Sequence, residues 1–211
     1  MKYTHILWDF NGTILDDVEA GIKSVNTLLR ERSLKTVDSI EEYHSVFGFP
    51  IIEYYRKLGF DFEKESYENI APIWVEQYLI NVKESKIYDG VRATVDFFKG
   101  HGASQIILSA TERDMLLEQL SELGIKDLFD DVLGLDNIHA ASKVGIAKEW
   151  REKNSTASVL MIGDTVHDLE VANAIGADCA LIAGGHQAMD VLKETGAPVY
   201  SSLFELISSL K

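Results

Sequence analysis

The sequence predicts an α/β protein, in which a parallel sheet carries helices on both faces and an all-helical segment is inserted near the start. Three observations support this. Short apolar runs alternate with amphipathic stretches of helical period towards both ends of the chain. The segment 15–85 shows helical patterns and no convincing strand. Polar clusters follow four of the apolar runs, as in open parallel sheets that bind ligands at their carboxyl edge.

Length and charge restrict the class of protein. The 211 residues carry a formal net charge of −14, from 34 acidic and 20 basic side chains. A chain of this length buries a full hydrophobic core without stabilising cross-links such as disulfides. Its surplus of acidic side chains argues against nucleic-acid or anionic-membrane partners. The N-terminus does not resemble a secretory signal, and no apolar run approaches the roughly 18 residues of a membrane span. We expect a cytoplasmic monomer or homodimer in which the single cysteine, Cys179, is buried.

Five apolar runs are predicted to form the sheet, because each is short enough for a buried parallel strand. The first covers residues 4–10 and ends on an Asn-Gly-Thr turn. The others cover 104–110, 131–135, 158–163 and 179–183, with a weaker candidate at 198–200. The stretches between them place apolar residues at helical spacing, and Gly124 and Gly176 mark the expected ends of two helices.

The inserted segment is predicted to be a cap of helices over the end of the sheet. An apolar stripe runs through residues 18–29, and Ser39 and Glu42 have the spacing of a capping box. Gly48-Phe49-Pro50 separates two further helices and predicts a loop over the site. The resulting division is a core domain and a cap domain, with boundaries at 1–14 and 86–211 for the core and 15–85 for the cap.

Each polar cluster, taken singly, has an ordinary structural explanation. Asp168 has the spacing of a capping box with Thr165, and Asp114 has the same spacing from Thr111. A lone lysine at a helix start, such as Lys143, is usually solvated. Together the clusters point to chemistry, because the carboxyl ends of parallel strands meet at one edge. The clusters are Asp9-Phe10-Asn11-Gly12-Thr13, Ser109 with Ala110, Lys143, and Asp164 with Asp168.

The composition of that edge predicts a site for a cation and a phosphate. Asp9, Asp164 and Asp168 would repel one another unless a cation compensates, and oxygen-only ligands suit Mg²⁺. Lys143 and Ser109 offer a charge and a hydroxyl to phosphate oxygens, and the turn at Gly12 offers backbone N–H groups. A metal ion, a set of groups that bind phosphate oxygens, and a carboxylate nucleophile are the components of a site for phosphoryl transfer.

The order Asp-x-Asn-Gly-Thr, Ser, Lys and Gly-Asp-x-x-x-Asp resembles the haloacid dehalogenase superfamily, in its phosphoglycolate-phosphatase-like branch with a helical cap. The resemblance covers nearly the whole chain and implies a Rossmann-like, HAD-like core. It also implies an Mg²⁺-dependent phosphatase that hydrolyses a small phosphorylated metabolite through an aspartyl-phosphate at Asp9. The implied catalytic residues are Asp9, Asn11 and Lys143; the implied metal ligands are Asp9, the backbone carbonyl of Asn11, Asp164 and Asp168; the implied substrate-binding residues are Asn11, Gly12, Ser109, Ala110 and Lys143. By the same resemblance, Asp168 supports the metal or pairs with Lys143.

Asn11 departs from the family pattern, which usually has a second Asp at this position. That Asp protonates the leaving group and later deprotonates the hydrolytic water, whereas an amide does neither. General acid–base catalysis contributes ~10²–10⁴-fold. Three interpretations remain open: a slow phosphatase suited to acyl or aryl phosphates, a non-catalytic phosphometabolite-binding or regulatory protein, and deamidation of the Asn-Gly sequence. Val144 also departs, because the family often has Pro after the lysine.

Two other reactions of the superfamily are less compatible with these residues. Halide displacement needs neither a cation nor a phosphate-binding lysine, so the retained Asp164 and Asp168 favour phosphorus chemistry. A phosphonatase-like reaction needs a cap lysine, and no lysine of the cap is marked as buried by its sequence context. For the substrate, Arg56, His44 and His186 are candidate anion contacts, although a surface role is favoured for each. Trp74 and Tyr78 are predicted to pack in the cap core.

Overall fold

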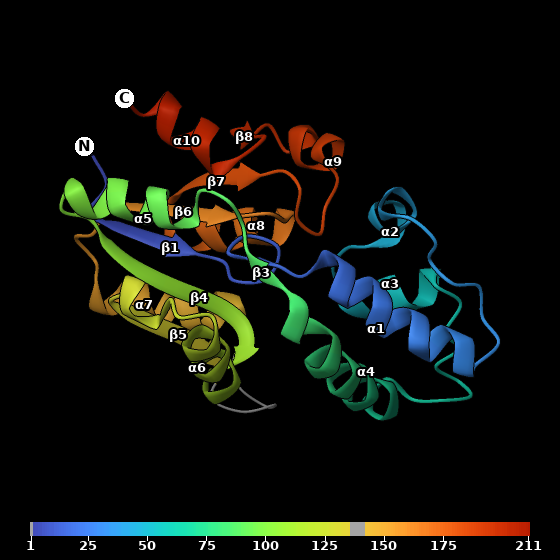
Figure 1. Cartoon of the computed structure of the whole chain (residues 1–211). Helices are drawn as coiled ribbons and strands as arrows, with labels where there is room; N and C mark the ends of the chain where they lie inside the picture. The colour runs from blue at the N-terminus through green and yellow to red at the C-terminus, as the bar shows by residue number, and fades with distance from the viewer. Residues whose placement is uncertain (1, 136–141) are drawn as a thin grey trace.

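The computed structural model describes residues 2–135 and 142–211. Six strands form one parallel sheet in the order β5-β4-β1-β6-β7-β8 (Figure 1). The predicted parallel sheet is therefore confirmed, and its first strand lies inside it. The strands are β1 (His5–Trp8), β4 (Ser104–Glu112), β5 (Asp131–Leu135), β6 (Val159–Gly163), β7 (Asp178–Ile182) and β8 (Val199–Tyr200).

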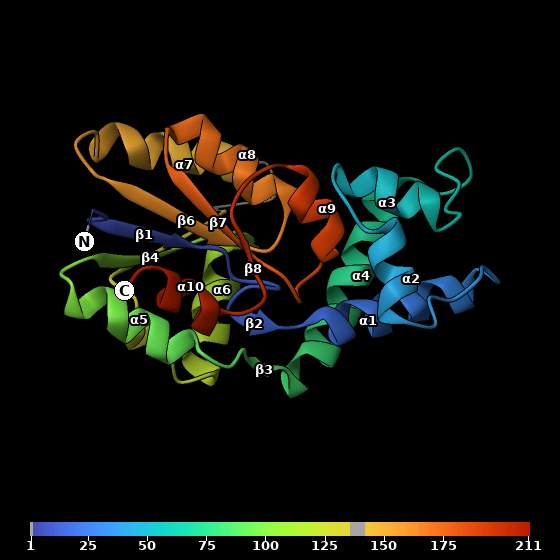
Figure 2. The same ribbon diagram turned by 90° about the horizontal axis from the view of Figure 1, so that it is seen from above.

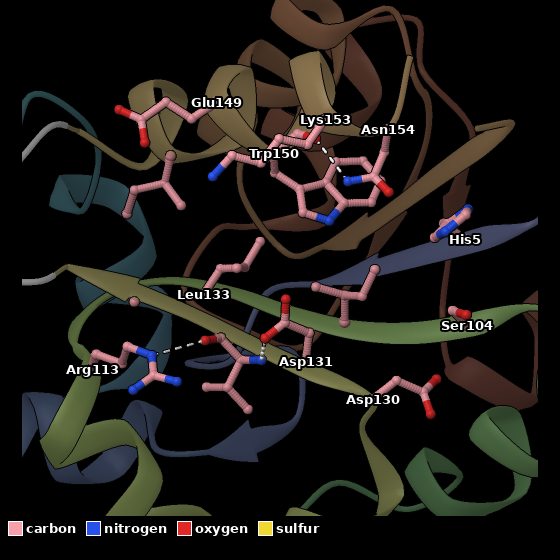
Figure 3. Close-up of a pocket in the computed structure, with 14 residues that line it drawn as sticks. His5, Ser104, Arg113, Asp130, Asp131, Leu133, Glu149, Trp150, Lys153 and Asn154 are labelled. Atoms are coloured by element: carbon pink, nitrogen blue, oxygen red, sulfur yellow. Dashed lines mark hydrogen bonds between the residues drawn. The ribbon is translucent and has the colours of Figure 1, made fainter. Parts of the chain in front are cut away.

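Helices cover both faces of the sheet (Figure 2). One layer contains α5 (Val91–Gly100), α6 (Arg113–Glu122) with the short 3-10 helix η2 (Lys126–Leu128), and α10 (Leu203–Ser209). The other contains α7 (Lys143–Lys153), α8 (Val166–Ile175) and α9 (Met189–Glu194). In the central strand, Trp8 packs towards the first layer and Leu7 towards the second, because successive strand residues alternate faces. Cys179 lies in β7 and is buried between the sheet and the second layer, as its predicted burial requires.

Several element boundaries differ from those predicted. β1 ends at Trp8, because the Phe10 carbonyl accepts hydrogen bonds from the N–H groups of residues 13–15 and the backbone turns. β4 continues to Glu112 and shifts its register against β5 after Leu108. The suggested capping box of Thr111 with Asp114 is wrong, since α6 begins at Arg113 and the Glu112 side chain caps it.

The cap consists of α1 (Val18–Glu31), α2 (Ile40–Val46), α3 (Ile51–Lys57), α4 (Tyr67–Asn81) and the 3-10 helix η1 (Val82–Glu84). These helices enclose a core of their own and lie beyond the carboxyl end of β1 (Figures 1 and 2). The predicted capping box at Ser39 is half present. The Ser39 hydroxyl accepts from the Glu42 N–H, but the Glu42 carboxylate accepts from the Asp38 N–H instead of the Ser39 N–H. Residues 47–50 separate α2 from α3, as the Gly-Phe-Pro sequence predicts.

The prediction of no strand between residues 15 and 85 is wrong at its first two positions. β2 (Leu15–Asp16) pairs antiparallel with β3 (Lys86–Ile87), where the chain leaves the core and returns to it. Two residues show too little alternation for recognition from sequence. We propose this crossing as the boundary between the core (1–14 and 86–211) and the cap (15–85).

Candidate active site

Asp9 and Asp164 are neighbours because the strands that precede them are neighbours. β1 pairs with β6 in the register Trp8↔Ile162, and each aspartate follows its strand directly. The Asp9 N–H continues the ladder by donating to the Ile162 carbonyl at 2.8 Å. One carboxylate oxygen from each of Asp9, Asp164 and Asp168 lies within 4.8 Å of the others. The structure thus brings together the three carboxylates that the sequence placed at this edge.

Lys143 is buried in the centre of this cluster and not solvated. It is the first residue of α7, and Ser142 caps that helix by accepting from the Gly145 N–H. The Lys143 Nζ lies 2.5 Å from Asp9 Oδ1 and 2.5 Å from Asp168 Oδ1. Burial alone would lower the pKa of Lys143, but the two carboxylates outweigh it and hold the pKa above its ordinary value. Lys143 is therefore a permanent cation between two carboxylates.

Asp168 has both of the roles that the sequence offered. Its Oδ2 accepts from the Thr165 N–H at 3.0 Å, which together with the Asp168 N–H on the Thr165 side chain forms the capping box of α8. The same Oδ2 also accepts from the Thr165 hydroxyl at 2.7 Å. Its Oδ1 contacts Lys143. The cap fixes the carboxylate, and the fixed carboxylate holds the lysine against Asp9.

Two glycines allow the loops around Asp164 to approach closely. Asp164 Oδ1 accepts from the Thr13 hydroxyl at 2.7 Å, and Oδ2 accepts from the His186 N–H at 2.7 Å. A Cβ atom would lie 2.3 Å from Asp164 Oδ2 at Gly12 and 2.2 Å at Gly185. Gly12 also has φ +74°, a conformation that side chains disfavour. The glycine of the first motif is thus required by packing against the fourth motif.

Ser109 lies inside β4 and is joined to Asn11 through Thr111. The Ser109 hydroxyl donates to Thr111 Oγ1 at 3.1 Å and accepts from the Thr111 N–H at 3.0 Å. Thr111 Oγ1 donates in turn to Asn11 Oδ1 at 3.1 Å. Ser109 is buried, whereas Ala110 is exposed. Of the two residues of β4 predicted to bind phosphate, Ser109 is therefore joined to the first motif, and Ala110 is exposed.

Asp17 is a residue of the site that sequence reasoning missed. Its side chain is buried beneath the cap, and its Oδ1 accepts from the Gly12 N–H at 2.8 Å and from His186 Nε2 at 3.2 Å. Burial raises the pKa of Asp17, but His186 and the hydrogen bonds outweigh it and leave the pKa below its usual value. Burial lowers the pKa of His186, but Asp17 outweighs burial, and the pKa is raised to about 9. The two side chains form a buried ion pair.

Three predictions about cap and substrate contacts can now be compared with the structure. Tyr78 is not only a cap-core residue, because its hydroxyl donates to Asp17 Oδ2 at 2.6 Å. His186 is not a surface residue, because Tyr43 and Asp17 contact its two ring nitrogens. His44 donates to the Gly185 carbonyl at 2.9 Å and so joins the cap to the core.

Of two further cap residues, one lies on the surface and the other contacts the core. Arg56 is exposed and pairs with Glu53, as the surface interpretation predicts. Phe49 stacks on His167 of α8 with ring centroids 4.9 Å apart, so the loop between α2 and α3 does lie on the core.

The His186–Asp17 pair makes stability depend on pH. A histidine with a folded pKa of about 9 and an ordinary value of 6.5 stabilises the fold fully below pH 6.5. This contribution declines as the pH rises through 9. We therefore expect the difference in Tm between the native chain and a His186→Gln variant to shrink between pH 6.5 and pH 9.5. Thermal melts at several pH values measure it, and a difference that stays constant or grows would contradict the pair.

Comparison with known proteins now identifies the family. A family model described as haloacid dehalogenase-like hydrolase matches residues 6–182. The chain belongs to this family. The family match confirms the resemblance found in the sequence, and the HAD-like core and helical insertion of the structure agree with it.

Individual relatives of this haloacid dehalogenase-like hydrolase are distant in sequence and similar in fold. It is 26% identical to the pyrophosphatase PpaX of Listeria innocua, over 80% of this chain and 78% of the relative. It is 27% identical to a phosphoglycolate phosphatase of Nitrosococcus oceani, over 68% of this chain and 66% of the relative. The haloacid dehalogenase-like protein SP0104 of Streptococcus pneumoniae has a TM-score of 0.82 at 17% identity, over 100% and 99% of the two chains. The predicted class, a hydrolase of phosphatase type, is confirmed by these matches.

Within residues 2–135 and 142–211, every helix is too short or too polar to cross a bilayer.

Proposed function

We propose that this hydrolase is an Mg²⁺-dependent phosphatase that removes phosphate from a small phosphorylated metabolite through an aspartyl-phosphate at Asp9. The observation that carries the proposal is the contact of Asp9 with Lys143 beside Asp164, at the carboxyl edge of the sheet. The family match and the names of the distant relatives support phosphate transfer as the reaction class.

In the proposed first step, an Asp9 carboxylate oxygen attacks phosphorus and the bond to the leaving oxygen breaks. Lys143 lies beside this carboxylate and stabilises negative charge on the transferring phosphoryl group. Ser109 is proposed to bind the phosphoryl oxygens. The Gly12 N–H, which the sequence offered for the same role, already donates to Asp17 Oδ1 and to the Leu15 carbonyl. In the second step, water attacks the aspartyl-phosphate, which releases inorganic phosphate and regenerates the Asp9 carboxylate.

The donor chemistry of the site fits a divalent cation. The four carboxylates of Asp9, Asp17, Asp164 and Asp168 face two cations, Lys143 and His186, so negative charge is in excess. Burial and the neighbouring carboxylates raise the pKa of Asp9 well above its usual value, and burial raises that of Asp164 to about 6.

A bound cation would favour the ionised forms of these carboxyl groups. Asp9, Asp164 and the Asn11 carbonyl would hold Mg²⁺, and Asp168 would support the metal site. The ion would supply charge stabilisation to the phosphoryl group.

Asn11 determines which leaving groups are suitable. The side chain carries no proton that titrates, so the leaving oxygen must depart with little protonation. Acyl and aryl phosphates meet this condition, and ordinary alkyl phosphates are expected to react slowly. The same feature favours the second candidate function, a phosphometabolite-binding or regulatory protein without useful turnover.

An assay with p-nitrophenyl phosphate separates the two functions. We expect hydrolysis with Mg²⁺ that stops when EDTA removes the metal and returns when Mg²⁺ is added in excess. Mg²⁺ alone should also raise the Tm, because a ligand that binds the folded state stabilises it. No metal-dependent turnover on aryl, acyl or sugar phosphates would contradict the phosphatase. Thermal stabilisation by a phosphorylated metabolite without turnover would then support the binding function.

A further inference from the structure

The Asn11 amide joins the loop between β1 and β2 (residues 9–14, the nucleophile loop) to the cap. Its Nδ2 donates to Asp17 Oδ2 at 2.9 Å and to the Tyr78 hydroxyl at 2.6 Å. Its Oδ1 accepts from the Thr111 hydroxyl. An amide has two N–H donors, and both are engaged here. The Asn11 side chain therefore presents no free N–H to a substrate, and it serves the connection between core and cap.

Asp17 is the acceptor at the centre of this connection. One carboxylate receives hydrogen bonds from the first motif through Asn11 and Gly12, from the cap through Tyr78, and from the loop after β7 through His186. A buried carboxylate is tolerated only while donors surround it. The adjacent Asp16 is exposed, so burial distinguishes Asp17 from its neighbour.

Positions 11 and 17 are complementary as amide and carboxylate. An Asp at position 11 would set two carboxylates at hydrogen-bond distance in a buried site, which disfavours ionisation of both. An Asn at position 17 would place an amide where Gly12, His186, Tyr78 and Asn11 all direct donors, and two acceptor oxygens would be reduced to one. Exchanging the two residues restores one amide and one carboxylate.

We propose that Asp17 is a positioning residue of the active site, which pairs with Asn11 and so fixes the nucleophile loop against the cap. The pair tolerates exchange of the amide and the carboxylate between the two positions. It does not tolerate two carboxylates or two amides. The pairing stands on contacts alone. Its effect on turnover rests on the proposed phosphatase function.

A cycle of Asn11→Asp, Asp17→Asn and the double exchange tests the pairing, with Asp16→Asn as the matched control. We expect each single variant to lose about 5–10 °C in Tm, and the double exchange to return to within about 3 °C of the native chain. The control should leave Tm unchanged. Losses that add in the double variant would overturn the pairing. If both single variants fail to fold, a folded double variant supports the pairing and an unfolded one overturns it.

Turnover of p-nitrophenyl phosphate with Mg²⁺ tests the positioning role. Each single variant should lose about tenfold or more in kcat, and the double exchange should recover at least the native kcat, because it also places an acid at position 11. A double variant with native Tm and without recovered kcat would reduce the pair to a structural contact and overturn the positioning role. If the native chain shows no turnover, the proposed function fails, and the Tm cycle still decides the pairing.

Discussion

Asp9→Asn is expected to abolish hydrolysis of p-nitrophenyl phosphate, with a loss of about 10⁴-fold or more, comparable to the loss of a nucleophile in other enzymes. The amide is isosteric but does not attack phosphorus. Folding should be retained, because Lys143 keeps its second partner, Asp168, when the charge at position 9 is removed. Initial rates with Mg²⁺ measure the effect.

The exposed Asp16, the last residue of β2, supplies the control for that experiment. Asp16→Asn should keep the native rate, which excludes a general effect of removing a carboxylate near the cap. Turnover in the Asp9→Asn protein within tenfold of the native rate would contradict a nucleophile at position 9.

Lys143→Met is expected to have the largest effect on stability. It leaves Asp9 and Asp168 as buried carboxylates without their cation, and breaking a buried pair in this way costs about 3–5 kcal/mol. For a chain of this size the Tm should fall by roughly 10 °C at pH 7.5 in the presence of EDTA. The loss should be smaller at pH 5, because the pKa of Asp9 is already raised by burial and the neutral acid needs no cation.

Lys148, on the same helix α7, is exposed and provides the matched control. Lys148→Met should change the free energy of unfolding by less than about 0.5 kcal/mol at either pH. A Lys143→Met protein that melts within 2 °C of the native chain at pH 7.5 would show that the buried ion pairs contribute little. Calorimetry or circular dichroism melts give both values.

Local sequence patterns determined the sheet, the helix ends and the order of the motifs. Apolar runs of strand length, the N-cap at Ser39, the capping box at Thr165 and the αL glycine at Gly176 are signals within a few residues of the structure they specify. Once the strands were known to be parallel, the gathering of Asp9, Lys143 and Asp164 followed from topology. The strand pair β2–β3 was missed because two residues carry no readable period.

Only the tertiary structure decided which polar residues near these motifs enter the site. Asp16 and Asp17 are identical neighbours in sequence, yet one is exposed and the other is held by donors from the cap and from the loop after β7. Those donors, Tyr78 and His186, lie 61 and 169 residues further along the chain. The sequence by itself therefore determined the fold, the family and the missing carboxylate at Asn11. Burial and long-range hydrogen bonds placed another carboxylate beside it, because desolvation and donor geometry exist only once the cap has packed on the core.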